Sequence, residues 1–229
     1  MVTGMKAGYN KSMKRALPLL IAAICLLSLF FSCSRTEPKI LYGFMELVYY
    51  SGYDKPEERL SFFILPEDDD GVENLSELYL YHDREGLKWF INSDDWVKHE
   101  EDGKTWIGSR NIAMSGDAIL PRGQYRAVLV TKGGEQTERK FTFDGPEESP
   151  YPFPFLSIIG GTYRIDSRYP INRFICYDQE GNPVQTVTVT EIEGITRDLR
   201  ISNNARSIAL WAEDPEYSIS ALTDAVMLR

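Results

Sequence analysis

Short β-rich runs separated by turn residues dominate the chain after residue 40. They recur roughly every 8 to 15 residues, and almost no segment shows the helical spacing of apolar side chains. Short strands bury their apolar faces only by pairing into sheets and packing one sheet on another. The pattern therefore predicts an all-β protein.

Seven strands are expected in the first half of this region. They cover 40–50, 59–65, 75–81, 87–91, 105–107 with 112–114, 125–131 and 137–143. The last two strands show the clearest alternation of apolar and polar residues, and Lys132-Gly133-Gly134-Glu135 stands between them. A Gly-Gly pair supplies the positive φ angles of a tight turn, so these strands should form a hairpin.

A short motif precedes this hairpin, Leu120-Pro121-Arg122-Gly123-Gln124-Tyr125. It resembles the tyrosine corner of immunoglobulin-like and fibronectin type III sandwiches, in which a tyrosine hydroxyl binds the backbone of the preceding loop. The resemblance covers residues 40–145, about the size of one such domain. It implies an immunoglobulin-like β-sandwich, outside the antibody-type subclass because the Cys-Trp-Cys framework is missing.

The second half repeats the β pattern after a proline-rich interruption. Residues 146–155 hold four prolines interleaved with aromatic residues, which predicts a semi-rigid linker. Strands are expected at 158–165, 174–177, 184–190, 207–211 and 222–228, and the last two resemble the closing strands of a second small sandwich. The fold prediction is one or two immunoglobulin-like sandwiches, with 156–229 as a second small β domain. The alternative is one extended β structure.

The N-terminal segment has the order of an export signal. Lys14 and Arg15 precede an apolar run from Ala16 to Phe31, followed by Ser32 and Cys33. Sixteen residues with a proline fall short of the roughly 20 that span a bilayer, so a cleaved signal peptide over residues 1–32 is favoured over a permanent membrane helix. Met13 reads as a conventional signal start, which leaves Met1 and Met13 as alternative start sites.

The end of this segment, Phe30-Phe31-Ser32-Cys33, resembles the lipobox of bacterial lipoproteins. It departs from the common Leu-Ala-Gly/Ser-Cys pattern at two positions. The resemblance implies a diacylglycerol-modified and palmitoylated Cys33, cleavage before it by signal peptidase II, and the lipid bilayer as a partner. Ordinary secretion with a chance cysteine is the alternative.

Only six residues, Ser34 to Lys39, separate Cys33 from the first expected strand, and they reach at most roughly 20 Å. The folded part, after the short lipidated tether 33–39, should therefore lie close to the membrane. Ser34 rather than aspartate after the lipidated cysteine leans, by the sorting rule of diderm bacteria, toward the outer membrane. The expected location is that membrane, facing the periplasm or the cell surface.

Charge and cysteine content narrow the function classes. The chain has 25 basic and 34 acidic residues, a net charge of −9, which argues against nucleic acid as a partner. Cleavage before Cys33 removes four basic residues and no acidic one, so the mature charge becomes −13. With Cys33 acylated, Cys176 is the remaining thiol, and its apolar neighbours predict a buried side chain rather than a disulfide partner.

Motifs for hydrolysis, phosphate binding and zinc binding are missing from the sequence. We therefore expect no catalytic residues, no metal and no cofactor. His82 and His99 are predicted to be solvated loop or strand-end residues, and the acidic run Glu67 to Gly71 a solvated loop, because its contiguous aspartates do not fit an EF-hand.

Trp89, Trp96 and Trp106 lie within 18 residues and are interleaved with acidic residues. Core packing of at least two of them is the default interpretation, and an aromatic binding surface for protein or sugar is the alternative. The sequence as a whole predicts a non-catalytic binding or assembly lipoprotein of the cell envelope with a protein partner. The alternative function is a lipoprotein whose sandwich binds a glycan or another ligand through this tryptophan region.

Overall fold

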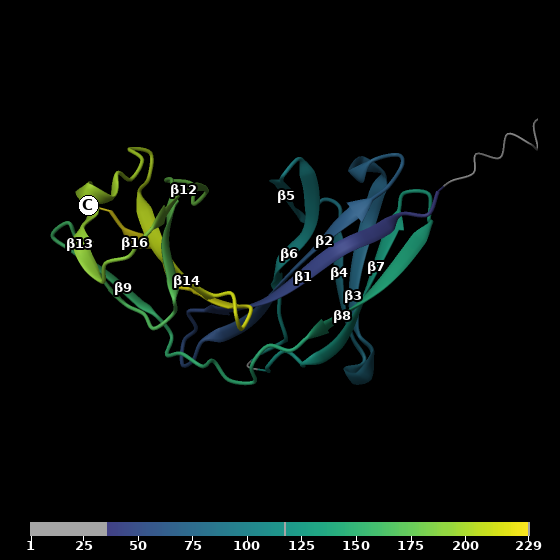
Figure 1. The fold of residues 1–229 in the computed structure, drawn as a ribbon, viewed down its shortest axis with the longest axis horizontal. Coiled ribbons are helices and arrows are strands. Elements are labelled where there is room, and N and C mark those ends of the chain that lie inside the picture. The colour runs from purple at the N-terminus through teal and green to yellow at the C-terminus, as the bar shows by residue number, and fades with distance from the viewer. Residues whose placement is uncertain (1–35, 117, 229) are drawn as a thin grey trace, which may run out of the picture. The chain divides into compact units, whose positions relative to one another are not determined.

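A computed structural model describes residues 36–116 and 118–228, and within them nearly all regular structure is β (Figure 1). The signal segment, the lipobox and Cys33 lie outside the described residues. The strands are β1 (Lys39–Tyr50), β2 (Glu57–Glu67), β3 (Leu75–His82), β4 (Leu87–Asn92), β5 (Val97–Glu101), β6 (Lys104–Ile112), β7 (Gly123–Thr131), β8 (Gln136–Phe143), β9 (Phe155–Ile159), β10 (Thr162–Asp166), β11 (Ile171–Tyr177), β12 (Pro183–Thr188), β13 (Glu193–Ile195), β14 (Ser207–Asp214), β15 (Ile219–Leu222) and β16 (Val226–Met227). Three short 3-10 helices accompany them: η1 (Val72–Asn74), η2 (Asp83–Glu85) and η3 (Thr196–Leu199). The all-β prediction is confirmed.

The first eight strands form an immunoglobulin-like sandwich. One sheet has the order β4-β3-β7-β8, and the opposing strands run β1-β2-β6-β5. This order matches the immunoglobulin arrangement, in which strands A, B, E and D form one sheet and strands C′, C, F and G form the other. Alternating side chains from both sheets, such as Phe62, Leu78 and Leu129, are fully buried between them.

The tyrosine corner is present. Tyr125, near the start of β7, is fully buried, and its hydroxyl donates a 2.7 Å hydrogen bond to the Pro121 carbonyl. Burial also raises the pKa of this hydroxyl, so it stays a neutral donor. The motif Leu120 to Tyr125 therefore makes the backbone hydrogen bond expected of a tyrosine corner.

Tyr125→Phe should reduce the free energy of unfolding by about 1 to 3 kcal/mol, because it removes this bond and leaves the partly buried Pro121 carbonyl without its donor. Urea denaturation measures the change. Tyr42→Phe is the matched control, since the Tyr42 side chain is exposed, and should change stability by less than about 0.5 kcal/mol. Equal effects for the two variants would show that the corner does not stabilise the fold.

The second half forms a smaller pair of packed sheets. Its sheets are β9-β10-β13 and β12-β11-β14-β15, with β16 also paired to β14. Tyr163 and Phe174 meet edge to face at 5.2 Å in its core, and Cys176 is buried there as expected. Burial raises the pKa of the Cys176 thiol, which keeps it protonated.

One sheet runs through both halves. Strand β15 pairs in parallel with β1 through Leu47 to Tyr50 against Ile219 to Leu222, and β1 pairs with β2 on its other edge. The result is a nine-stranded sheet of order β12-β11-β14-β15-β1-β2-β6-β5, with β16 attached to β14. Residues 37–229 accordingly group as one compact unit. The side chains on one face of this sheet therefore form a continuous surface.

Three local expectations are corrected. The run 158–165 is not one strand, because Gly160 and Gly161 have positive φ and turn the chain between β9 and β10. In the turn after β7 only Gly134, not Gly133, has positive φ. The segment 105–107 and Ile112 belong to one strand, β6, which ends at Ile112 rather than 114 and pairs with an unpredicted β5.

The segment 144–154 contains no strand and is held at both ends. Arg122 donates through Nε to the Gly145 and Pro146 carbonyls at 3.1 Å each. Further along, the Tyr151 hydroxyl donates a 2.6 Å hydrogen bond to Asp214 on β14, and the Tyr151 ring lies 4.8 Å from the Tyr169 ring. These contacts attach the proline-rich segment to both halves of the chain.

The Tyr151 contact should make stability depend on alkaline pH. The hydrogen bond to Asp214 raises the pKa of Tyr151 to about 12. A raised pKa means that this contribution is complete below the ordinary tyrosine pKa, near pH 10, and is lost as pH rises toward 12. The stability difference between the wild type and Tyr151→Phe, measured by urea denaturation, should therefore shrink across that window. A constant difference from pH 8 to pH 12 would contradict the assignment.

Candidate functional site: an aromatic groove

The three clustered tryptophans do not share a surface. Trp96 is buried at 7% exposure, and Trp89 packs into the first sandwich with its Nε1 donating to the Ala113 carbonyl at 2.9 Å. Trp106 alone lies on the outer face of its sheet, half-buried on β6. The default expectation of core packing thus describes Trp89 and Trp96, and the structure brings Trp106 together with different partners.

Those partners surround a groove of about 630 Å³ on one face of the nine-stranded sheet. Side chains from both halves of the chain line it, and more of its surface is aromatic or aliphatic than charged. The lining residues are Phe44, Glu46, Tyr50, Ser61, Phe63, His99, Trp106, Arg110, Arg173, Ile175, Tyr177, Pro183, Thr186, Trp211 and Leu222. Volume and composition match those of ligand pockets in general.

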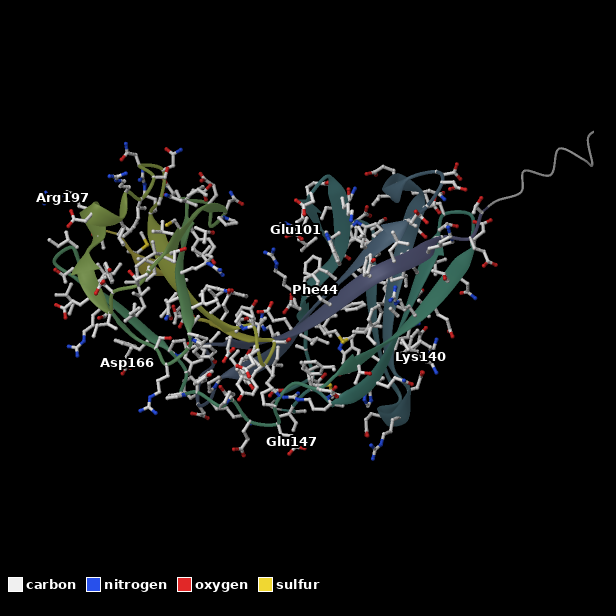
Figure 2. All side chains as sticks on the ribbon, in the orientation of Figure 1. Phe44, Glu101, Lys140, Glu147, Asp166 and Arg197 are labelled. Atoms are coloured by element: carbon white, nitrogen blue, oxygen red, sulfur yellow. The ribbon has the colours of Figure 1, made fainter. Side chains whose placement is uncertain are left out.

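Strand alternation places the aromatic side chains of the first sandwich on this face. Phe44 on β1 is directly opposite Phe63 on β2, and their rings stack at 5.5 Å. Trp106 lies 5.6 Å from the Phe44 ring. In Figure 2, Phe44 lies on the side of β1 toward β14, whereas Lys140 lies on the opposite side of the sandwich, on β8. Phe44 is 46% exposed, so this cluster presents an open apolar surface to the groove.

The second half contributes Trp211, which is hydrogen-bonded to the acidic partner of an ion pair. Arg173 on β11 is the cross-strand neighbour of Trp211 on β14, which in turn neighbours Leu222 on β15. Arg173 forms an ion pair with Glu213, and the same carboxylate accepts a 2.7 Å hydrogen bond from Trp211 Nε1. The ion pair with Arg173 positions Glu213, and the hydrogen bond from Trp211 Nε1 to Glu213 then orients the indole before any ligand binds.

The middle of the groove is charged. Glu46 is half-buried, and this burial raises the pKa of its carboxyl, with Glu213 acting in the same direction and Arg110 opposing it. The Arg110 charge likewise opposes the burial that raises the pKa of the Tyr50 and Tyr177 hydroxyls. The Arg110 guanidinium lies 5.8 Å from the Phe63 ring centre. It is exposed and has no ion pair within the part of the chain that the structure describes.

The two histidines, His82 and His99, differ in solvent exposure. His99 is exposed and lines the groove beside Trp106, its cross-strand neighbour. His82 was expected to be solvated and is instead 2% exposed, with Nε2 3.2 Å from the Arg122 carbonyl and the ring edge-on to Tyr125 at 4.8 Å. The expectation failed because the imidazole fills the core beside the tyrosine corner.

The acidic run Glu67 to Gly71 forms a loop with short-range hydrogen bonds to Asp68. Asp68 accepts hydrogen bonds from the backbone of Asp70 and the side chain of Asn74, and the Asp69 and Asp70 side chains are exposed. Among residues 36–116 and 118–228, no group of three or more metal-ligating side chains is close enough to hold an ion. In the same residues no helix is long and apolar enough to cross a membrane.

Sequence reasoning missed the other half of the groove. Trp211, Arg110 and Arg173 were not singled out, since each lies in an ordinary alternating strand. The only local signal was the pair Phe44 and Glu46, two outward positions of a strand in which one side chain is aromatic and exposed. The arrangement as a whole suits binding, with flat apolar rings flanking a few oriented charges.

Comparison with known proteins gives little further information. No protein-family model and no curated protein matches the sequence. Among solved structures, dimeric latent PorU from Porphyromonas gingivalis is similar at 13% identity and a TM-score of 0.32, over 84% of this chain and 20% of PorU. Murine CEACAM1b is similar at 9% identity and a TM-score of 0.25, over 81% of this chain and 99% of that one. This chain therefore spans only a fifth of PorU, and neither likeness carries a functional argument.

Proposed function

We propose that this protein is a bacterial envelope lipoprotein, anchored by acylated Cys33, that binds a ligand without catalysis through the aromatic groove. The observation that carries the binding part is the groove itself, which combines exposed rings with charges held in fixed positions. The order of basic, apolar and small residues before Cys33 supports the anchor. The ligand is a partner in the envelope, either protein or glycan.

The short tether gives the anchor a structural consequence. Strand β1 begins at Lys39, so five residues, Ser34 to Pro38, connect it to Cys33 and reach at most roughly 20 Å. The groove then operates close to the membrane surface. By the identity of Ser34, that membrane is the outer one, with the protein facing the periplasm or the cell surface.

The anchor is tested by replacing Cys33. Wild-type protein from cells fed an alkyne-labelled palmitate should carry the label and sediment with membranes, and Cys33→Ala should lose the label and leave the membrane fraction. Cys25→Ala is the control, because Ile24 before it makes a poor cleavage site, and it should behave as wild type. A soluble, unlabelled wild-type protein would exclude the anchor.

The binding role is tested in intact cells with a photoreactive amino acid. Position 99 lies at the groove and is exposed, and position 140 is exposed on β8 of the other sheet. Irradiation should produce a discrete adduct, of protein or of glycan, from position 99 and none from position 140. Adducts from neither position, or the same adducts from both, would contradict binding through the groove.

One observation favours a glycan as the ligand of the groove. Trp106 lines the groove together with a second tryptophan, Trp211, that the sequence interpretation had not considered. Trp89 and Trp96 contribute to the sandwich interior instead. A sugar-binding role therefore rests on Trp106 and Trp211 rather than on the original cluster of three.

A further inference from the structure

We infer that the ligand of the aromatic groove is an acidic saccharide, a sugar chain bearing carboxylate or sulfate groups, stacked on Trp106 and Trp211 and held by Arg110. This inference rests on the proposed binding function and names the chemistry of its ligand. Three features of the groove support it: the exposed faces of the two indoles, the Arg110 charge, and the paired backbone where β1 meets β15.

The indole rings of Trp106 and Trp211 each offer a face on which a sugar ring can stack. Trp106 is half-buried against the Phe44 ring, and Trp211 is half-buried with its Nε1 already bonded to Glu213. The polar atom of Trp211 is thus satisfied, and what remains for a ligand is the face of the ring. Flat apolar faces that lose little entropy on binding suit the C–H faces of pyranose rings.

The Arg110 charge at the groove favours an anion. Arg173 is neutralised by Glu213, whereas Arg110 is exposed beside Phe63 without an ion pair among the described residues. A guanidinium binds carboxylate or sulfate through two parallel hydrogen bonds. An available arginine in an aromatic groove, on a chain of net charge −9, is a local exception to the acidic surface. Its positive charge attracts an acidic ligand to this groove.

The backbone of the groove floor argues against an extended peptide. Strands β1, β2, β14 and β15 are each paired on both edges within the nine-stranded sheet. Strands β1 and β15 pair from Leu47 to Tyr50 against Ile219 to Leu222, and β2 pairs with the other edge of β1. At this junction the N–H and C=O groups are used, and strand addition, the main source of affinity for extended peptides, is blocked. Only side chains such as Glu46, Ser61 and Thr186 offer hydrogen bonds along the floor. Hydroxyl-rich sugars are recognised by such side chains.

Titration calorimetry on the full-length protein in detergent micelles tests the inference. The probes are tetragalacturonic acid, its fully methyl-esterified form, a hyaluronan hexasaccharide and a heparin hexasaccharide. At least one acidic probe should bind, and for galacturonate the methyl ester should bind at least tenfold more weakly. Trp211→Ala and Arg110→Met should each weaken binding of that acidic probe at least tenfold.

The control variant is Phe90→Ala, which removes an exposed ring from β4, on the other sheet, and should leave the affinity unchanged. Circular dichroism verifies that each variant is folded. If the methyl ester binds as well as the acid, or if Arg110→Met binds as well as wild type, the acidic part of the inference is wrong. If no acidic probe binds while position 99 still forms a protein adduct in cells, the saccharide is wrong and the groove remains a binding site. Absence of both overturns the proposed function as well.

Discussion

Glu58→Ala should lower the free energy of unfolding by about 3 to 5 kcal/mol, because it strands the buried charge of Arg122. The two side chains are only 8% and 16% exposed, and two hydrogen bonds of 3.0 and 3.1 Å join them. Glu58 also accepts from the Leu120 backbone N–H at 3.1 Å. Arg122 in turn bonds the carbonyls of Leu120, Gly145 and Pro146. The pair thus fixes the tyrosine-corner loop and the start of the proline-rich segment.

Urea denaturation of Glu57→Ala provides the control, since Glu57 is an exposed neighbour whose ion pair with Arg59 is worth at most about 1 kcal/mol. The double variant Glu58→Ala, Arg122→Met should recover part of the loss, because it removes the stranded charge. A loss for Glu58→Ala no larger than that for Glu57→Ala would show that the buried pair does not hold this corner together.

Gly108→Ala should destabilise the protein by about 3 kcal/mol through overpacking. A Cβ at this position would lie 2.0 Å from the Phe62 carbonyl oxygen and 2.7 Å from the Phe63 Cα. Both are backbone atoms of β2, so β2 and β6 would have to separate. Because β6 carries Trp106 and Arg110, the substitution should also weaken binding by the groove.

Lys104→Ala is the control for this substitution, as an exposed position on the same strand, and should change stability by less than about 0.5 kcal/mol. Thermal and urea unfolding measure both variants. A Gly108→Ala protein with wild-type stability would mean that β2 and β6 are not in close contact at Gly108.

Much of the fold could be predicted from local patterns. Alternating strands with one buried face, such as β3 and β7, and the motif ending in Tyr125 were recognisable because each is set by neighbouring residues. Strand β5 was missed because all five of its side chains are exposed, and an edge strand of charged residues has no apolar alternation. The pairing of β15 with β1 joins residues far apart in the chain, and no local pattern encodes it.

The pairing of β15 with β1 also explains why only part of the groove could be predicted from the sequence. Trp106 was singled out because it lies near two other tryptophans and several acidic residues in the sequence, and it does line the groove. Its partners Trp211 and Arg173 reach the same face only because β14 and β15 continue the sheet of the first sandwich. Trp89 packs against the sandwich core because of its register in β4, since a shift of one residue moves a side chain to the other face of a sheet. Trp96 lies in the turn between β4 and β5 and is buried there.

The most direct test of the groove uses the four indole N–H resonances of the protein in a proton–nitrogen correlation spectrum. Addition of the acidic saccharide that binds in calorimetry should shift the resonances of Trp106 and Trp211, which line the groove. Those of Trp89 and Trp96, inside the first sandwich, should stay in place. Shifts confined to Trp89 and Trp96, or binding that moves none of the four, would contradict the assignment of the groove as the ligand site.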